Sequence, residues 1–131
     1  MHRQRSGLVN FSRQSLLIDP AAESDRIIRF IRQNVRQTMR RGGGVVGISG
    51  GIDSAVVLAL TIRAFGPRNV IAVMMPDRDS DPLSETYGRE LASVLGVTPI
   101  LEDITAPLLG FDCYQRRDVA IARVVPEYNP A

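Results

Sequence analysis

Short apolar runs alternate with longer stretches of helical periodicity along this 131-residue chain. The runs are rich in β-branched residues, which is typical of strands buried on both faces. The apolar runs cover residues 45–48 and 70–75, a third strand is predicted over residues 97–104, and the helical patterns cover residues 20–41, 53–65 and 82–95. Such alternation predicts an α/β fold, an open parallel sheet with right-handed crossovers and helices on both faces.

The ends of the predicted helices carry specific signals. Asp19-Pro20 and Asp81-Pro82 each place a capping carboxylate before a proline, whose missing N–H costs nothing in the first helical turn. Gly66-Pro67 and Gly96 follow the second and third helical patterns and predict where these helices end. A further helix is predicted over residues 112–125.

Three strands make a thin sheet, since open doubly wound sheets usually have about five or six strands. Residues 45–48 would then form an edge strand with exposed backbone groups. We therefore expect an incomplete domain over residues 19–131, preceded by an N-terminal arm over residues 1–18 that shows no clear periodicity. The missing half would come from further sequence or from a partner.

Composition argues against several kinds of site. All 16 basic residues are arginine, so no lysine is available for a Schiff base or for a Walker-type phosphate loop. With His2 as its one histidine, the chain is a poor candidate for a Ser-His-Asp or Cys-His nucleophile. The single cysteine, Cys113, cannot form an internal disulfide. The sequence also has no run of 18 apolar residues, about the length needed to span a membrane. We expect a cytoplasmic protein.

Charge is unevenly distributed along the chain. Residues 1–41 hold nine arginines and three acids, whereas residues 42–131 hold seven arginines and eleven acids. A basic first segment could bind nucleic acid. However, arginines at three- and four-residue steps over residues 26–40 are more typical of the solvated face of a helix, and aromatic residues make up only 5%. We expect no nucleic-acid partner.

One stretch carries recognisable chemistry: Gly47-Ile48-Ser49-Gly50-Gly51-Ile52-Asp53-Ser54. It follows the first predicted strand and opens the next helix. Ligands of open parallel sheets bind at the carboxyl ends of strands, and the amides of a helix N-terminus attract anions. Gly50 and Gly51 would let the main chain approach a phosphate and adopt conformations closed to other residues. Ser49 and Ser54 would add hydroxyl donors.

Asp53 is unexpected in a phosphate loop, because its carboxylate would repel the ligand. A magnesium ion held by one carboxylate and by phosphate oxygens would remove this conflict, so we predict that Asp53 is a metal ligand. The alternative is that Asp53 and Ser54 only cap the helix. Capping is the more common role for either residue taken alone, but it does not explain the whole Ser-Gly-Gly-x-Asp-Ser block. Arg78 and Ser80 follow the second strand at the same edge; they could contact the ligand or serve ordinary loop and cap roles. Arg116 and Arg117 could meet a phosphate, but surface charge is the more common role.

The block Ser49–Ser54 resembles the pyrophosphate loop of the N-type ATP pyrophosphatases. The longer strings over residues 47–56 and 69–76, followed by Arg78-Asp79-Ser80, most resemble NAD synthases. The resemblance covers roughly residues 20–105. It implies a Rossmann-like fold of the ATP-pyrophosphatase type and an amide-forming ligase: ATP adenylates a carboxylate, magnesium pyrophosphate leaves, and ammonia attacks the acyl-adenylate.

The resemblance also implies cofactors and partners. For NAD synthases the carboxylate is that of deamido-NAD, the ammonia is free or derived from glutamine, and the proteins are commonly homodimers. It implies ATP binding by residues 47–54 and Mg²⁺ at Asp53, with no catalytic side chain in this chain. Later family elements are missing, so the chain resembles the amino-terminal half of such a protein. Two alternatives stay open: a related amidotransferase with another carboxylate or carbonyl substrate, and a non-catalytic nucleotide-binding fragment.

Overall fold

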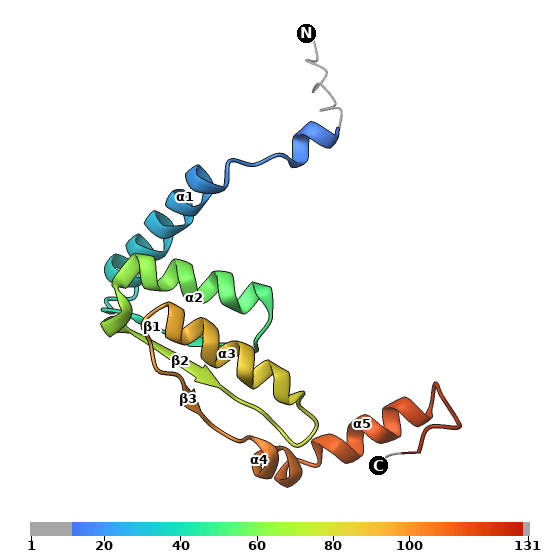
Figure 1. Ribbon diagram of the computed structural model, residues 1–131. Helices are drawn as coiled ribbons and strands as arrows, with labels where there is room; N and C mark the ends of the chain where they lie inside the picture. The colour runs from blue at the N-terminus through green and yellow to red at the C-terminus, as the bar shows by residue number, and fades with distance from the viewer. Residues whose placement is uncertain (1–11, 130–131) are drawn as a thin grey trace, which may run out of the picture.

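Three parallel strands form the sheet at the centre of the protein (Figure 1). The computed structural model describes residues 12–129. In these residues the strand order is β1-β2-β3, with β1 at Gly44–Gly47, β2 at Val70–Met74 and β3 at Ile100–Leu101. The predicted open parallel α/β sheet is confirmed, and β1 lies at its edge as expected.

Helices connect and extend this sheet. They are α1 (Pro20–Gln33), α2 (Ile52–Phe65), α3 (Pro82–Val94), α4 (Thr105–Gly110) and α5 (Cys113–Ala122), with short turns η1 (Arg13–Leu16), η2 (Asn34–Thr38) and η3 (Pro67–Asn69). No described helix is long and apolar enough to cross a lipid bilayer. Most of the predicted arm over residues 1–18, including His2, lies outside the described residues, so the division into arm and domain stays a prediction.

The helix-end signals in the sequence act as predicted. The side chain of Asp19 accepts hydrogen bonds from the amides of Ala21 and Ala22, at 2.9 and 3.1 Å. Asp81 accepts one from the amide of Leu83 at 2.9 Å. Gly66 follows α2 with a φ of +82°, a backbone conformation that favours glycine.

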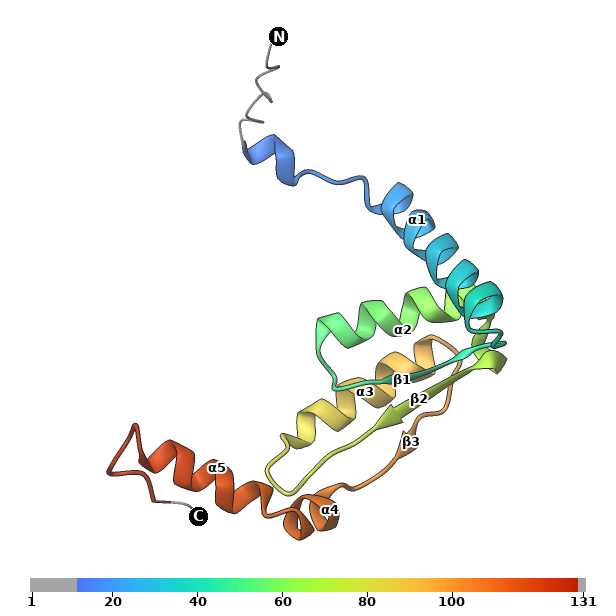
Figure 2. The same cartoon turned by 180° about the vertical axis from the view of Figure 1, so that it is seen from behind.

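Helices α2 and α3 cover the same face of the sheet (Figures 1 and 2). On that face a side chain at Gly44 would contact Thr61 of α2, and one at Gly88 of α3 would contact Met74. Both crossovers step in one direction along the sheet, and right-handed crossovers of that kind place their helices on one side. The buried core lies between these layers, and α1 packs on α2 and adds Ile28 to it.

The opposite face of the sheet is open in the described residues, which corrects the expectation of helices on both faces. Val45 of β1 is 69% exposed and Ile71 of β2 is 49% exposed, whereas their neighbours Val46 and Ala72 are buried. The run at residues 45–48 is therefore buried on one face only, because no described element covers the other.

Several element boundaries differ from prediction. The third strand was expected over residues 97–104, but β3 is shorter because the amide of Val97 donates to Ala92 at the end of α3 and because Pro99 has no N–H. The amides of Glu102 and Ile104 still donate to the main chain of Met74 and Pro76, both at 2.9 Å. The remaining differences are that the first helix becomes a π-helix at η2, that α4 was not predicted, and that α5 ends at Ala122.

Candidate functional site

The turn from β1 into α2 is held in shape by two serine hydroxyls. The amide of Ser49 donates to Oγ of Ser54 at 3.2 Å, and that hydroxyl donates to the carbonyl of Gly51 at 2.9 Å. The two serine Oγ atoms lie 3.3 Å apart. Ser49 and Ser54 therefore brace the predicted phosphate loop from within.

The two glycines of this turn have different roles. Gly50 has a φ of +76°, and a Cβ at this position would lie 2.5 Å from the carbonyl oxygen of Ser84 in α3. Gly51 has φ −86° and ψ 161°, an ordinary extended conformation. The expectation of a conformation closed to other residues is right for Gly50 and wrong for Gly51. The structural need for Gly50 comes from packing against α3.

The first turn of α2 presents backbone amides without acceptors. The first hydrogen bond of the helix runs from the amide of Ala55 to the carbonyl of Gly51, at 3.1 Å. Gly51 is the N-cap and has no side chain to satisfy the amides that precede this bond. Among the described residues, the amides of Ile52, Asp53 and Ser54 have no hydrogen-bond acceptor. Together with the helix dipole they can bind an anion.

Asp53 stands exposed on the same turn. Its carboxylate makes no hydrogen bond or ion pair with another described residue. Ser54 donates to the Gly51 carbonyl, and neither side chain accepts an amide of the first helical turn, which argues against a pure capping role for the pair. No group of three or more His, Cys, Asp or Glu side chains gathers as a metal cage in residues 12–129. A cation at Asp53 would therefore complete its shell with ligand and water oxygens.

A cavity of about 740 Å³ lies beside this turn, at the carboxyl ends of all three strands. Its size is in the range of small-molecule sites. The lining residues are Gly47, Ile48, Ser49, Met74, Met75, Pro76, Asp77, Ser80, Asp81, Pro82, Ser84, Glu85, Leu101 and Asp103. Four of the predicted site residues, Gly47, Ile48, Ser49 and Ser80, are thus brought to one cavity. Gly50 to Ser54 lie next to it, and Arg78 is not part of its wall.

Four carboxylates line the cavity and each is already engaged. Asp81 caps α3, and Oε1 of Glu85 lies 2.7 Å from an Arg89 guanidinium nitrogen. Hydrogen bonds from Thr105 hold the pKa of Asp103 below its usual range, and a hydrogen bond from the Ser80 hydroxyl does the same for Asp77. None of the arginines among residues 12–129 lines the cavity. Its charge therefore suits a neutral part of a ligand better than a phosphate.

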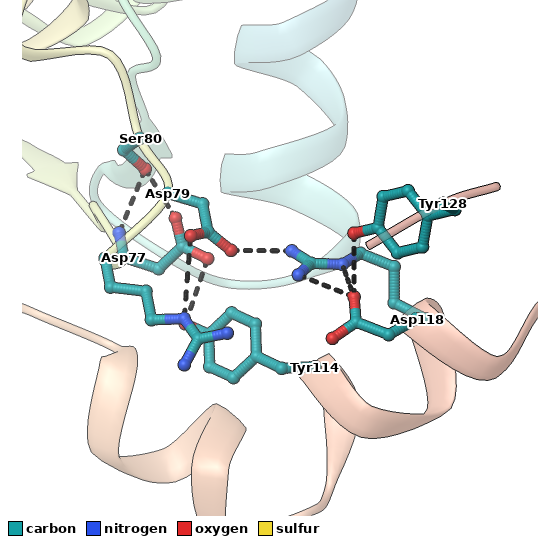
Figure 3. Close-up of polar contacts among 8 residues, drawn as sticks. Asp77, Asp79, Ser80, Tyr114, Asp118 and Tyr128 are labelled. Atoms are coloured by element: carbon teal, nitrogen blue, oxygen red, sulfur yellow. Dashed lines mark hydrogen bonds and ion pairs between the residues drawn. The ribbon is translucent and has the colours of Figure 1, made fainter. Parts of the chain in front are cut away.

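The guanidinium of Arg78 packs on Tyr114 of α5. Its guanidinium carbon lies 3.9 Å from the centre of the Tyr114 ring, and Arg117 of α5 donates to Asp79 at 2.6 Å (Figure 3). Arg117 is thus a partly exposed surface charge, and it is paired with Asp79 and Asp118. Sequence reasoning missed this cluster because its two halves lie far apart in the chain; the only signal was the alternation of charges in Asp77-Arg78-Asp79 and Arg116-Arg117-Asp118.

Comparison with known proteins shows which family shares these features. A family model described as NAD synthase matches residues 23–123. The NH(3)-dependent NAD(+) synthetase of Rhizobium meliloti (strain 1021) is 48% identical over 120 residues, which are 92% of this chain and 36% of the relative. The protein of the same name from Rhizobium rhizogenes (strain K84) is 47% identical over 118 residues, 90% of this chain and 36% of the relative.

Solved structures give the same result. The NH3-dependent NAD synthetase from Campylobacter jejuni, in complex with a nitrate ion, is 31% identical with a TM-score of 0.65, over 72% of this chain and 40% of that chain. The glutamine-dependent NAD+ synthetase from Acinetobacter baumannii, in complex with ADP, is 26% identical with a TM-score of 0.64, over 92% of this chain and 23% of that chain. The chain spans about a third of the length of its curated relatives, less than the half expected from sequence.

Proposed function

Because this chain belongs to the NAD synthase family, we propose that it supplies the ATP-binding part of an amide-forming ligase. In the proposed reaction the carboxylate of deamido-NAD attacks the α-phosphate of ATP, pyrophosphate leaves, and ammonia displaces AMP from the acyl-adenylate to give NAD. The observation that carries this proposal is the set of unpaired amides in the first turn of α2, which lie beside the exposed carboxylate of Asp53.

The proposed ATP orientation follows from charge. The triphosphate would lie against the amides of residues 52–54, where the helix dipole favours negative charge. The nucleoside would occupy the cavity, whose walls combine apolar side chains such as Met75 and Leu101 with carboxylate acceptors. We propose the whole block Gly47–Ser54 as the ATP-binding segment, with Ser80 at the far wall of the cavity.

Asp53 fits a magnesium ion. Its carboxylate is exposed, lies beside the candidate phosphate site and is free of partners in the described part of the chain. Mg²⁺ commonly binds one or two carboxylates, substrate phosphates and water, which is the donor set available here. When bound, the ion would supply positive charge beside the departing pyrophosphate.

The contribution of the chain itself is positioning and charge stabilisation. Amide donors aimed at the leaving pyrophosphate act where negative charge grows in the transition state, and removing one such donor typically costs about 10²–10³ in rate. The reaction needs no protein nucleophile, which agrees with the absence of lysine from the sequence.

The proposed partners are small molecules and a second copy of the longer protein. Ammonia is the proposed nitrogen donor, in line with the names of the most similar relatives described above. A glutamine route would need a separate glutaminase domain. We also propose that the ligase is a homodimer, as the sequence resemblance implies.

A chimera tests the proposal. This chain would replace the matching segment of the Rhizobium meliloti relative, and NAD, AMP and pyrophosphate would be measured with ATP, Mg²⁺, deamido-NAD and ammonia. We expect all three products in equal amounts, and loss of NAD formation on Asp53→Asn. AMP release only with a different acid would support the related amidotransferase. A folded chimera that binds ATP without forming any product would favour the non-catalytic fragment and contradict the proposal.

A further inference from the structure

The loop after β2, residues 76–81, contributes Pro76, Asp77, Ser80 and Asp81 to one wall of the cavity. It is braced internally, because Oγ of Ser80 accepts the amide of Asp77 at 3.0 Å and donates to Oδ1 of the same residue at 2.7 Å. The amide of Ser80 also donates to the carbonyl of Asp77, at 3.1 Å. These bonds fix the shape of the loop but not its position relative to the sheet.

Tyr114 of α5 reaches this loop from outside (Figure 3). Its hydroxyl donates to Oδ2 of Asp77 at 3.0 Å, so one carboxylate joins the loop's internal brace to α5. Tyr114 is 6% exposed, and its ring carries the guanidinium of Arg78 on its face, 3.9 Å from the ring centre. Burial, with Asp77 adding to it, raises the pKa of Tyr114, so the hydroxyl remains a donor.

Arg117 makes a second connection from α5 to the same loop. Its Nη1 donates to Oδ2 of Asp79 at 2.6 Å. The guanidinium is oriented by Asp118, which accepts from Nε at 2.9 Å and in turn accepts the hydroxyl of Tyr128 at 3.1 Å. Several charges form one network here, and networked surface ion pairs stabilise a contact more than isolated pairs do.

We infer that Tyr114 and Arg117 are positioning residues that hold the loop at residues 76–81 against the nucleoside of ATP. The inference rests on the proposed function, which assigns the cavity to that nucleoside. Beyond this loop α5 runs away from the sheet, as both ribbon views show (Figures 1 and 2). The hydrogen bonds of Tyr114 and Arg117 to Asp77 and Asp79 therefore connect the start of α5 to the cavity wall. Loosening the wall should weaken nucleoside binding and leave the phosphate site on α2 unchanged.

Calorimetry on the full chain with ATP, adenosine and inorganic pyrophosphate as separate probes tests the inference. Tyr114→Phe removes the hydroxyl and keeps the ring under Arg78. We expect its adenosine and ATP affinities to fall about fivefold, the cost of one lost hydrogen bond, while its pyrophosphate affinity stays at the wild-type value. Arg117→Gln should show the same split, and Arg117→Lys should restore part of the loss. The control is Tyr87→Phe, an exposed tyrosine of α3 whose hydroxyl bonds no described residue.

Wild-type adenosine affinity in both Tyr114→Phe and Arg117→Gln would overturn the inference, as would an equal loss of pyrophosphate affinity, which would indicate a general structural effect. If the wild-type chain binds neither ATP nor adenosine, the proposed function fails instead. Hydrogen exchange of the Ser80 amide in the ligand-free chain then decides the positioning role alone. Faster exchange in Tyr114→Phe than in Tyr87→Phe supports it, and equal exchange rejects it.

Discussion

Gly50 and Gly51 are neighbours in the sequence, but only one of them needs to be glycine. The close approach of Gly50 to Ser84 brings the turn after β1 against α3, and its φ of +76° would strain any other residue. The sequence indicated a glycine-rich turn but could not distinguish the two positions, because the contact that separates them comes from α3. The pairing of Arg117 with Asp79 was missed for the same reason.

Replacing each glycine by alanine should reveal this difference. Gly50→Ala should lower the free energy of unfolding by about 2 kcal/mol or more, since a left-handed conformation alone costs about 1–2 kcal/mol and the new Cβ meets a carbonyl. Gly51→Ala is the matched control and should lose less than about 1 kcal/mol, because its φ is ordinary. Urea unfolding measures both. Equal losses would contradict the packing role of Gly50.

The helices and strands show how far local chemistry determines this fold. The Asp-Pro starts of α1 and α3 and the glycine that ends α2 could be identified from sequence, because caps and turns depend on neighbouring residues. The length of β3 could not, since it depends on pairing with β2 and on the hydrogen bond that holds Val97 at the end of α3. The attachment of α5 likewise depends on side chains of a distant loop.

The attachment of α5 should depend on acid pH. The Arg117 hydrogen bond is the main cause that holds the pKa of Asp118 below its usual range. For Asp77 the main cause of a lowered pKa is the hydrogen bond from the Ser80 hydroxyl, and Tyr114 adds to it. A carboxylate with a depressed pKa stabilises the folded state above its unfolded value, and this contribution is lost as the pH falls through the folded value. We therefore expect α5 to stay attached above about pH 4 and to detach progressively below it.

The NMR signals of Tyr114 followed from pH 7 to pH 2 measure this transition. Arg117→Gln is the comparison: it removes the partner of Asp118, so its transition should begin at higher pH. The same transition in both proteins would contradict the role assigned to this ion pair.

As a whole, the described molecule is a sheet with one covered face and one open face. The open face presents Val45, Ile71 and Met75, an apolar surface that soluble proteins normally bury. The alternating pattern of the sequence predicted an open parallel sheet correctly. It could not show which face each helix covers, because that depends on strand order and on the direction of each crossover.

The open face and the edge at β1 should make the chain associate in solution. Val45→Lys places a charge on both features and should raise the concentration at which oligomers form, as measured by analytical ultracentrifugation. Val94→Lys is the control, a similarly exposed valine at the end of α3. Association that is unaffected by Val45→Lys, or reduced as much by Val94→Lys, would show that other surfaces drive it.

The most direct test of the nucleotide site is the binding of ATP to the full chain by calorimetry, with and without Mg²⁺. We expect binding that strengthens when Mg²⁺ is added. Asp53→Asn should weaken MgATP binding by at least about tenfold, without lowering thermal stability, and Glu90→Gln on α3 should have no effect. Equal MgATP affinity in the wild type and in Asp53→Asn would contradict the assignment of this turn as a magnesium-assisted triphosphate site.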